Sequence, residues 1–479
     1  MLLIIFFITH GYAEHVKLIP FGSLFLLLSA LLVIGFLLYR LCRWLIKDRQ
    51  KAALFLSFFL LIFLFFGAFQ DFFGRFHFTS ALAQLRVFVP VSVAVILLGF
   101  ILLKTTKRNL SRLRVFLNAL LTLSIMIDLA VISVALLRSP EKRNITLQGL
   151  RVCDTCARPT IYFILLDEYS GSHALKDFFN YDNSPFEQFL AGQGFKVNQQ
   201  TTSNYLLTVF SLASTLNMDY IQDLGPASIN NHYGYRKAVN SIGDNNVVRF
   251  LQQQGYRINN YSYFRLPDAA PEFKADYLPG ETDLITHKTM YSRVASNISR
   301  VLITKFGTRS LQERADNYYI HNNEAMMQGV LDLAGSDARK TSFTYVHLMM
   351  PHDPIAFDSL GNRITPFWAR PRYPLKERDD AYLQYLVYTN NRMRNFIKAL
   401  KEKTKGEAII MLMSDHGYRR IPLNKALRWQ TLNAIYLPQQ YQKQSEKWYD
   451  GMSNVNQFRV LFNAAFDQEL PVLRDSLVK

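Results

Sequence analysis

The stretch MLMSDHG, from Met411 to Gly417, ends an apolar run with an adjacent carboxylate and imidazole. The apolar part is typical of a buried strand, so Asp415 and His416 are expected where that strand reaches the surface. An oxygen ligand and a nitrogen ligand therefore stand side by side at one strand end.

Two other apolar runs in the chain end in the same manner. They extend from Thr160 to Leu166 and from Ser342 to Met350. Groups able to bind a metal or a phosphate lie at the end of each run, namely Asp167, Glu168, His347 and His352. We interpret the three endings as parts of one site.

From Pro159 onward, short apolar runs alternate with amphipathic stretches, which predicts an α/β domain with a mainly parallel sheet flanked by helices. Ligands in such sheets collect at the carboxyl ends of the strands. The predicted helices cover Val247 to Gln254 and about Tyr382 to Leu400. The predicted strands are Ile161 to Leu166, Tyr256 to Ile258, Ser342 to Met350, Ala408 to Met413 and Asn433 to Leu437.

The first third of the chain is far more apolar than the rest. Four of its runs are long enough, or nearly so, to cross ~30 Å of hydrocarbon. They are Phe21 to Tyr39, Ala52 to Gln70, Val87 to Leu103 and Val115 to Leu137. We predict a transmembrane helical domain of about four spans over residues 1–140, a linker over 141–158 and a catalytic domain over 159–479. The apolar segment Met1 to Thr9 is too short to span alone, so residues 1–20 contain a truncated helix of an additional span, an interfacial segment or part of a signal-like start.

The formal charge of +17 is concentrated in the apolar third, which argues against nucleic acid as a partner. Residues 1–151 hold 17 Lys and Arg against 5 Asp and Glu, whereas residues 152–479 hold 37 against 32. Basic residues crowd the loops at 40–51 and 104–114, but only Arg75 and Arg86 lie between the second and third spans. The positive-inside rule then makes the two basic loops cytoplasmic and the large domain of this integral membrane protein extracytoplasmic.

Three further features of the sequence qualify this organisation. Cys153 and Cys156 form a CxxC that precedes a strand, and we interpret it as a small disulfide rather than a zinc or thioredoxin-like site. Asp128 lies within a predicted span and is either functional or paired inside the helical bundle. The stretch from about Asp268 to Gln312 is hard to parse, and we interpret it as an excursion near the mouth of the site.

The residue types at the strand ends indicate a metal. The oxygens of Glu168 and Asp415 with the nitrogen of His416 suit zinc or manganese better than magnesium or calcium. Three protein ligands leave a position open, where a metal would turn a hydroxyl into a nucleophile. Thr208 precedes a helix-like run and is our candidate, although periodicity alone favours a helix N-cap.

Four segments resemble the alkaline phosphatase and sulfatase superfamily. They are LLDEYSG at 165–171, NYLLTVFSLASTLNM at 204–218, VHLMMPHDP at 346–354 and MLMSDHG at 411–417. Behind membrane helices, this order is most similar to the membrane-anchored branch that contains lipoteichoic acid synthase and lipid A phosphoethanolamine transferase.

The resemblance implies roles for individual residues. Glu168, Asp415 and His416 match metal ligands, and Asp167 matches the first acid of the paired sulfatase version. Thr208 matches the nucleophile, which also binds the metal. His352 matches a histidine that contacts the transferred group, and His347 resembles the first histidine of the HxMxxHxP pattern.

Two departures from the family patterns limit what the resemblance implies. The C/S-x-P-x-R motif of sulfatases is missing around Thr208, and threonine cannot form the sulfatase aldehyde. Tyr418, Arg419 and Arg420 replace the usual acidic continuation after DHG.

The resulting functional hypothesis is a membrane-anchored, metal-dependent phospho-transferase. It would move a phosphoethanolamine- or phosphoglycerol-like headgroup from a membrane lipid donor to an envelope glycan or lipid through a phospho-threonine. The main alternative is a sulfatase-like hydrolase of phosphodiesters or sulfuric esters. A non-catalytic envelope protein and a transporter are the remaining alternatives.

Overall fold

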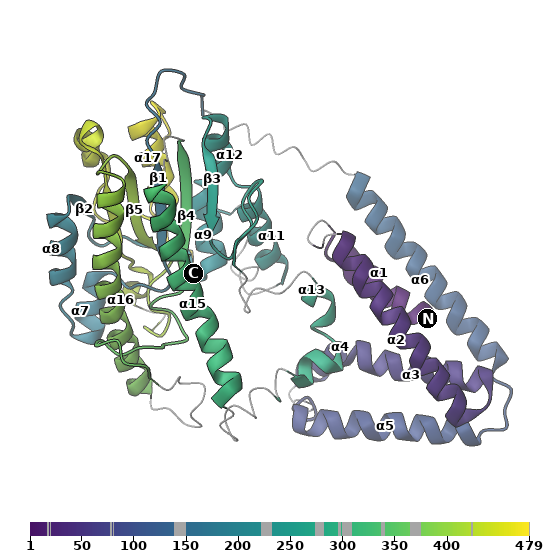
Figure 1. The fold of residues 1–479 in the computed structure, drawn as a ribbon. Helices are drawn as coiled ribbons and strands as arrows, with labels where there is room; N and C mark the ends of the chain where they lie inside the picture. Colours follow the sequence, from purple (N-terminus) through teal and green to yellow (C-terminus); the bar gives the residue numbers. More distant parts are fainter. Residues whose placement is uncertain are drawn as a thin grey trace. The chain divides into compact units, whose positions relative to one another are not determined.

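The computed structural model covers the chain and divides it into two units (Figure 1). One unit comprises Met1–Arg143 with Asp276–Leu302, and the other comprises Asn144–Ala275 with Ile303–Lys479. All residues are described except 17–18, 20, 77–78, 80, 138–149, 222–231, 274–281, 296–297, 299–308, 337–340, 365–374, 423–424 and 479.

The first unit is helical, as its apolar composition predicts. Its N-terminal helices are α1 (Leu2–Ala13), α2 (Phe21–Ile46), α3 (Arg49–Leu64), α4 (Phe66–Gly74), α5 (Leu85–Thr105) and α6 (Ser111–Leu137). Among the described residues, α2, α5 and α6 are long and apolar enough to cross a membrane. The predicted second span is a pair of helices, α3 and α4, bent by 54°, so four spans result only if this pair counts as one.

Helix α1 lies against α6, and it buries Leu3, Ile4 and Phe7. Asp128 of α6 is buried too, and its Oδ1 lies 3.3 Å from Nδ1 of His10 on α1. Asp128 thus has a partner within the helical unit, one of the two alternatives that the sequence left open.

The stretch around α13 (Asp283–Thr286) groups with the helical unit, although the sequence analysis placed this part of the chain near the mouth of the site. Ile285 is 2% exposed and belongs to the apolar core of the helices. The N–H of Gly67 donates to the carbonyl of Lys288 at 2.6 Å. The Arg293 guanidinium pairs with Asp71 at 2.8 Å.

The second unit contains a six-stranded sheet with the order β2-β6-β5-β1-β4-β3. Strands β5, β1, β4 and β3 pair in parallel, and β6 is antiparallel to both of its neighbours. The mainly parallel sheet and its five predicted strands are therefore confirmed. The strands are β1 (Ile161–Leu166), β2 (Phe195–Val197), β3 (Arg257–Tyr261), β4 (Ser342–Leu348), β5 (Ile409–Ser414) and β6 (Asn433–Tyr436).

Helices flank the sheet on both faces (Figure 1), which explains why β1, β4 and β5 are largely apolar and fully buried. They are α7 (Ser172–Phe179), α8 (Ser184–Gly192), α9 (Thr208–Asn217), α11 (His232–Gly243), α12 (Asn246–Gln253), α15 (Arg309–Gly335), α16 (Leu375–Lys403) and α17 (Gln457–Ala465). Leu166 at the end of β1 is in register with Leu348 of β4 and Ser414 of β5. The residues that follow these strands therefore emerge at one edge of the sheet.

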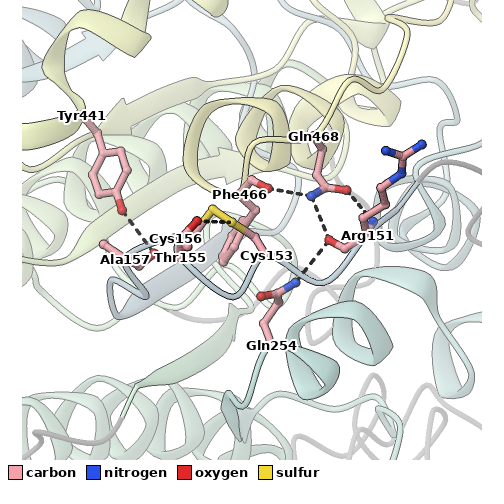
Figure 2. Close-up of a disulfide and its surroundings, with 9 residues drawn as sticks. All are labelled: Arg151, Cys153, Thr155, Cys156, Ala157, Gln254, Tyr441, Phe466 and Gln468. Atoms are coloured by element: carbon pink, nitrogen blue, oxygen red, sulfur yellow. Dashed lines mark hydrogen bonds between the residues drawn. A yellow bond between two sulfur atoms is a disulfide. The ribbon is translucent and has the colours of Figure 1, made fainter.

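The predicted disulfide between Cys153 and Cys156 is present (Figure 2). Next to it, the Gln468 side chain binds the backbone of Arg151 twice (Figure 2). Its Oε1 accepts from the Arg151 N–H at 2.8 Å, and its Nε2 donates to the Arg151 carbonyl at 2.9 Å. Arg151 is thereby held to the segment that follows α17.

Candidate active site

Asp167, Asp415 and His416 form a buried cluster at the carboxyl edge of the sheet. One possible ligand atom from each of them lies within 4.8 Å of the others. The Nε2 of His416 is 3.8 Å from Asp167 Oδ1 and 3.4 Å from Asp415 Oδ2. Ligands at ~2.0–2.1 Å from a tetrahedral zinc lie about 3.3 Å apart, so the spacing suits a metal.

The unused oxygens of the two aspartates support a cation at this cluster. Asp415 Oδ1 accepts from the N–H groups of Glu168 at 3.0 Å and His416 at 2.9 Å. Asp415 Oδ2 and Asp167 Oδ1 are buried and have no hydrogen-bond partner among the described residues. A buried carboxylate oxygen without a partner is costly, and a bound divalent ion removes that cost.

His416 presents the correct nitrogen to the cluster. Its Nδ1 lies 2.9 Å from the carbonyl of Gly417, which can only accept, so Nδ1 carries the proton and donates. The lone pair of Nε2 is therefore available to a metal.

The residue after His416 has to be glycine for this backbone conformation. A Cβ at position 417 would lie 2.4 Å from the carbonyl oxygen of Gln430.

His347 lies behind Asp167 and is completely buried. Its Nε2 lies 3.2 Å from Asp167 Oδ2, and its Nδ1 lies 2.9 Å from the hydroxyl of Tyr345. The hydroxyl donates to Nδ1, so Nε2 donates to the carboxylate and orients it. The sequence analysis assigned His347 to substrate, and that assignment stays a prediction; in the structure the His347 ring is in hydrogen-bond contact with Asp167.

Thr208 is the first residue of α9, and Leu207 occupies the N-cap position. The Thr208 side chain is therefore not the helix cap that periodicity favoured. Its Oγ1 lies 3.4 Å from Nε2 of His416. The first N–H groups of a helix lack intrahelical partners and attract anions, so this hydroxyl is close both to the cluster and to an anion-binding element.

Glu168 lies outside the three-residue cluster. Its backbone is left-handed, with φ 63°, and its Oε1 accepts from the Arg419 N–H at 2.9 Å and from Arg419 Nε at 3.4 Å. Its Oε2 lies 3.7 Å from Nε2 of His352. Burial alone would raise the pKa of Glu168, but the nearby His352 and Arg419 outweigh it and hold that pKa below its usual value.

His352 accepts a hydrogen bond from the Arg419 guanidinium at Nε2, while its Nδ1 donates to the Asp353 carbonyl at 2.7 Å. In this arrangement neither nitrogen has a proton to give to a leaving group. Burial lowers the pKa of His352, but the carboxylates of Asp167 and Glu168 raise it overall, against the opposing charge of Arg419.

A family model described as "Sulfatase" matches residues 159–456. The chain belongs to the sulfatase family. The matched region begins just before β1 and contains all the residues of the site described above. No curated protein matches the chain.

Several solved structures are similar to this sulfatase-family chain. The C-terminal periplasmic domain of EcEptC from Escherichia coli is 13% identical over 65% of this chain and 84% of that chain, with a TM-score of 0.40. Lipooligosaccharide phosphoethanolamine transferase A from Neisseria meningitidis is 12% identical over 80% of this chain and 70% of that chain, with a TM-score of 0.38. The putative sulfatase yidJ from Bacteroides fragilis is 14% identical over 67% of this chain and 77% of that chain, with a TM-score of 0.41. The family assignment depends on the sequence match alone.

Two residues of this sulfatase-family site were not among the predicted site residues. Arg419 was noted only as a departure from the family pattern, although its place directly after DHG-Tyr was a usable signal. Tyr382 lies on α16, and its hydroxyl donates to the Glu168 carbonyl at 2.7 Å and accepts from the Ser170 N–H at 3.2 Å. No motif surrounds Tyr382, so only the fold reveals that it holds the turn after β1.

Proposed function

We propose that this chain is a membrane-anchored, metal-dependent transferase that moves a phospholipid headgroup to an envelope glycan or lipid. The headgroup is of the phosphoethanolamine or phosphoglycerol kind, and Thr208 carries it as a covalent phospho-threonine. The observation that carries the proposal is the 3.4 Å approach of the Thr208 hydroxyl to the Asp167, Asp415 and His416 cluster. Apolar helices of the length needed to cross a membrane supply the anchor.

Asp167, Asp415 and His416 would hold one divalent ion, zinc or manganese, because two carboxylates and an imidazole suit these metals. When bound, the ion supplies positive charge that lowers the pKa of the nearby hydroxyl, so that its proton passes to solvent. Glu168, which the sequence analysis counted among the ligands, pairs with Arg419 instead in this proposal.

In the first step, Thr208 Oγ1 attacks phosphorus and forms a P–O bond. The bond between phosphorus and the oxygen of the diacylglycerol leaving group breaks, and its electron pair stays on that oxygen. The oxygen then takes a proton from water. In the second step, a hydroxyl of the acceptor attacks phosphorus and loses its proton to solvent. The bond to Oγ1 then breaks, and Thr208 regains a proton.

The location of the second unit follows from charge and cysteine chemistry. The basic loops at 40–51 and 104–114 favour a cytoplasmic position for those loops. The disulfide between Cys153 and Cys156 fits an oxidising compartment. We therefore place the catalytic unit on the extracytoplasmic side of a bacterial-type inner membrane, next to its lipid donor.

The alternative within the same family is a hydrolase that passes the group to water. Thr208 cannot be converted to the aldehyde that sulfatases use, which favours phosphoric over sulfuric esters. Envelope lipids and glycans should be compared by mass spectrometry between cells with the parent protein and cells with Thr208→Ala. A modified acceptor that disappears in the variant supports transfer, free headgroup without acceptor indicates hydrolysis, and full activity of the variant rules out the mechanism.

A further inference from the structure

Three carboxylates crowd one buried region of the second unit. Asp167, Glu168 and Asp415 have side chains that are 2%, 7% and 0% exposed. Glu168 and Asp415 are linked directly, because the Glu168 N–H donates to Asp415 Oδ1. Three ionised carboxylates in so small a volume repel one another unless cations compensate them.

The hydrogen-bond partners of His347 and His416 leave one unprotonated nitrogen on each ring, so these two rings add no positive charge to the region. His347 accepts from Tyr345, His416 directs the lone pair of Nε2 toward the cluster, and His352 accepts from Arg419. Arg419 brings a permanent positive charge to these carboxylates, and its backbone N–H and guanidinium both donate to Glu168. The Arg419 guanidinium and one divalent ion together carry three positive charges, which match three ionised carboxylates.

Arg419 is also the most exposed side chain among the carboxylates, histidines and arginine of this group. Its side chain is 33% exposed. In the described contacts, Glu168 and His352 receive two of the five N–H donors of the guanidinium. The remaining donors are sufficient for a tetrahedral oxyanion, which arginine binds with charge-assisted hydrogen bonds.

We propose that Arg419 is the second cation of this site: it holds Glu168 outside the metal shell and binds a non-bridging oxygen of the phosphoryl group being transferred. The assignment of a phosphoryl substrate rests on the proposed function. The pairing of Arg419 with Glu168 and the oxyanion binding do not require Thr208 to be a nucleophile.

Arg420 offers a matched control for Arg419. Its Nε lies 3.4 Å from Asp379 Oδ1, the same separation as between Arg419 Nε and Glu168, and its side chain is 28% exposed. Arg419→Gln and Arg420→Gln therefore remove the same charge from neighbouring residues. Only the first change should affect the site.

The full-length protein in detergent should be titrated with zinc against a competing chelator and, separately, with inorganic phosphate. Arg419→Gln should weaken phosphate binding by about tenfold or more, as expected for losing hydrogen bonds to a charged group. The same variant should bind zinc at least as tightly as the parent, because Glu168 is released and negative charge is left uncompensated. Arg420→Gln should match the parent in both titrations, and Arg419→Lys should recover part of the phosphate affinity.

Unchanged phosphate affinity in Arg419→Gln would overturn the proposal. Loss of zinc in that variant, with thermal unfolding like that of the parent, would overturn it too, since Arg419 would then support the metal shell. If Arg419→Gln does not fold, Arg419→Lys provides the test. A phosphate affinity of Arg419→Lys equal to that of the parent protein would contradict a role for the guanidinium group. Full transfer activity of Thr208→Ala would remove the proposed function and leave these binding results standing.

Discussion

Thr208 Oγ1 lies 3.4 Å from Nε2 of His416, although 208 positions separate the two residues in the chain. The contact joins the start of α9 to the end of β5. The lone pair of Nε2 faces the carboxylates of Asp167 and Asp415, so the hydroxyl lies beside the cluster that would hold a metal. The following predictions depend on this relationship.

The first prediction concerns the covalent intermediate. Incubation of the purified protein with a phospholipid labelled in its headgroup, without acceptor, should leave label on the peptide that contains Thr208. Mass spectrometry of the digested protein measures this. Thr208→Ala should abolish the label, because the variant lacks the Oγ1 atom that would form the bond to phosphorus.

Thr215→Ala is the control for that experiment, because Thr215 lies in the same helix and its hydroxyl donates to the Ser211 carbonyl at 2.8 Å. It should retain the label. Label that persists in Thr208→Ala, or that maps to another residue, contradicts the assignment of the nucleophile.

The second prediction distinguishes the roles in metal binding of the two adjacent acids that follow β1. Loss of a residue that only hydrogen-bonds to a metal ligand lowers metal affinity by roughly 10–100-fold. Asp167→Asn and Asp415→Asn should each lower zinc affinity by more than this, because each removes a direct ligand. Glu168→Gln should keep the bound ion, because Glu168 pairs with Arg419 and lies outside the cluster. Metal analysis after dialysis against a weak chelator distinguishes them, and zinc loss in Glu168→Gln would return Glu168 to the metal shell.

The structure also explains why the sequence could predict a site but not the orientation of every side chain. Parallel strands end at the same edge, so ligands that follow β1 and β5 must meet once Leu166 and Ser414 are in register. Asp167 and Glu168 are both acidic and adjacent, and no pattern reveals which one faces the cluster. The left-handed backbone of Glu168 and its contacts with Arg419 decide this, and they form only in the folded chain.

Other parts of the fold escaped the sequence analysis for comparable reasons. Strand β2 has only three residues, too few for a periodic signal. Ile285 packs in the core of the helical unit, which is a tertiary contact that local sequence does not encode. The apolar runs of β1, β4 and β5 were predictable because helices cover the sheet on both faces.

The third prediction tests whether His347 orients Asp167 or touches substrate. Tyr345→Phe removes the hydroxyl that lies 2.9 Å from Nδ1 of His347 and retains the aromatic ring in the core. Zinc affinity should fall by roughly tenfold, as for other partners of metal ligands, because the Asp167 carboxylate is less firmly held. The KM for the lipid donor should stay the same at saturating zinc. A raised KM with unaltered zinc binding would assign His347 to the substrate.

The fourth prediction concerns the side of the membrane on which the second unit lies. After mild reduction of intact bacterial cells that express the protein, a membrane-impermeant maleimide should label Cys153 and Cys156, because the disulfide that joins them belongs to the second unit, which we propose is extracytoplasmic. The double variant Cys153→Ser/Cys156→Ser should not be labelled, since the remaining Cys42 is buried among the helices. Arg108→Cys, introduced into that double variant, places an exposed thiol in a basic loop and should react only after the membrane is permeabilised. If the Arg108→Cys variant is labelled in intact cells, and Cys153 and Cys156 of the parent protein react only after permeabilisation, the topology is the reverse. A lipid donor in the outer leaflet is then out of reach of Thr208.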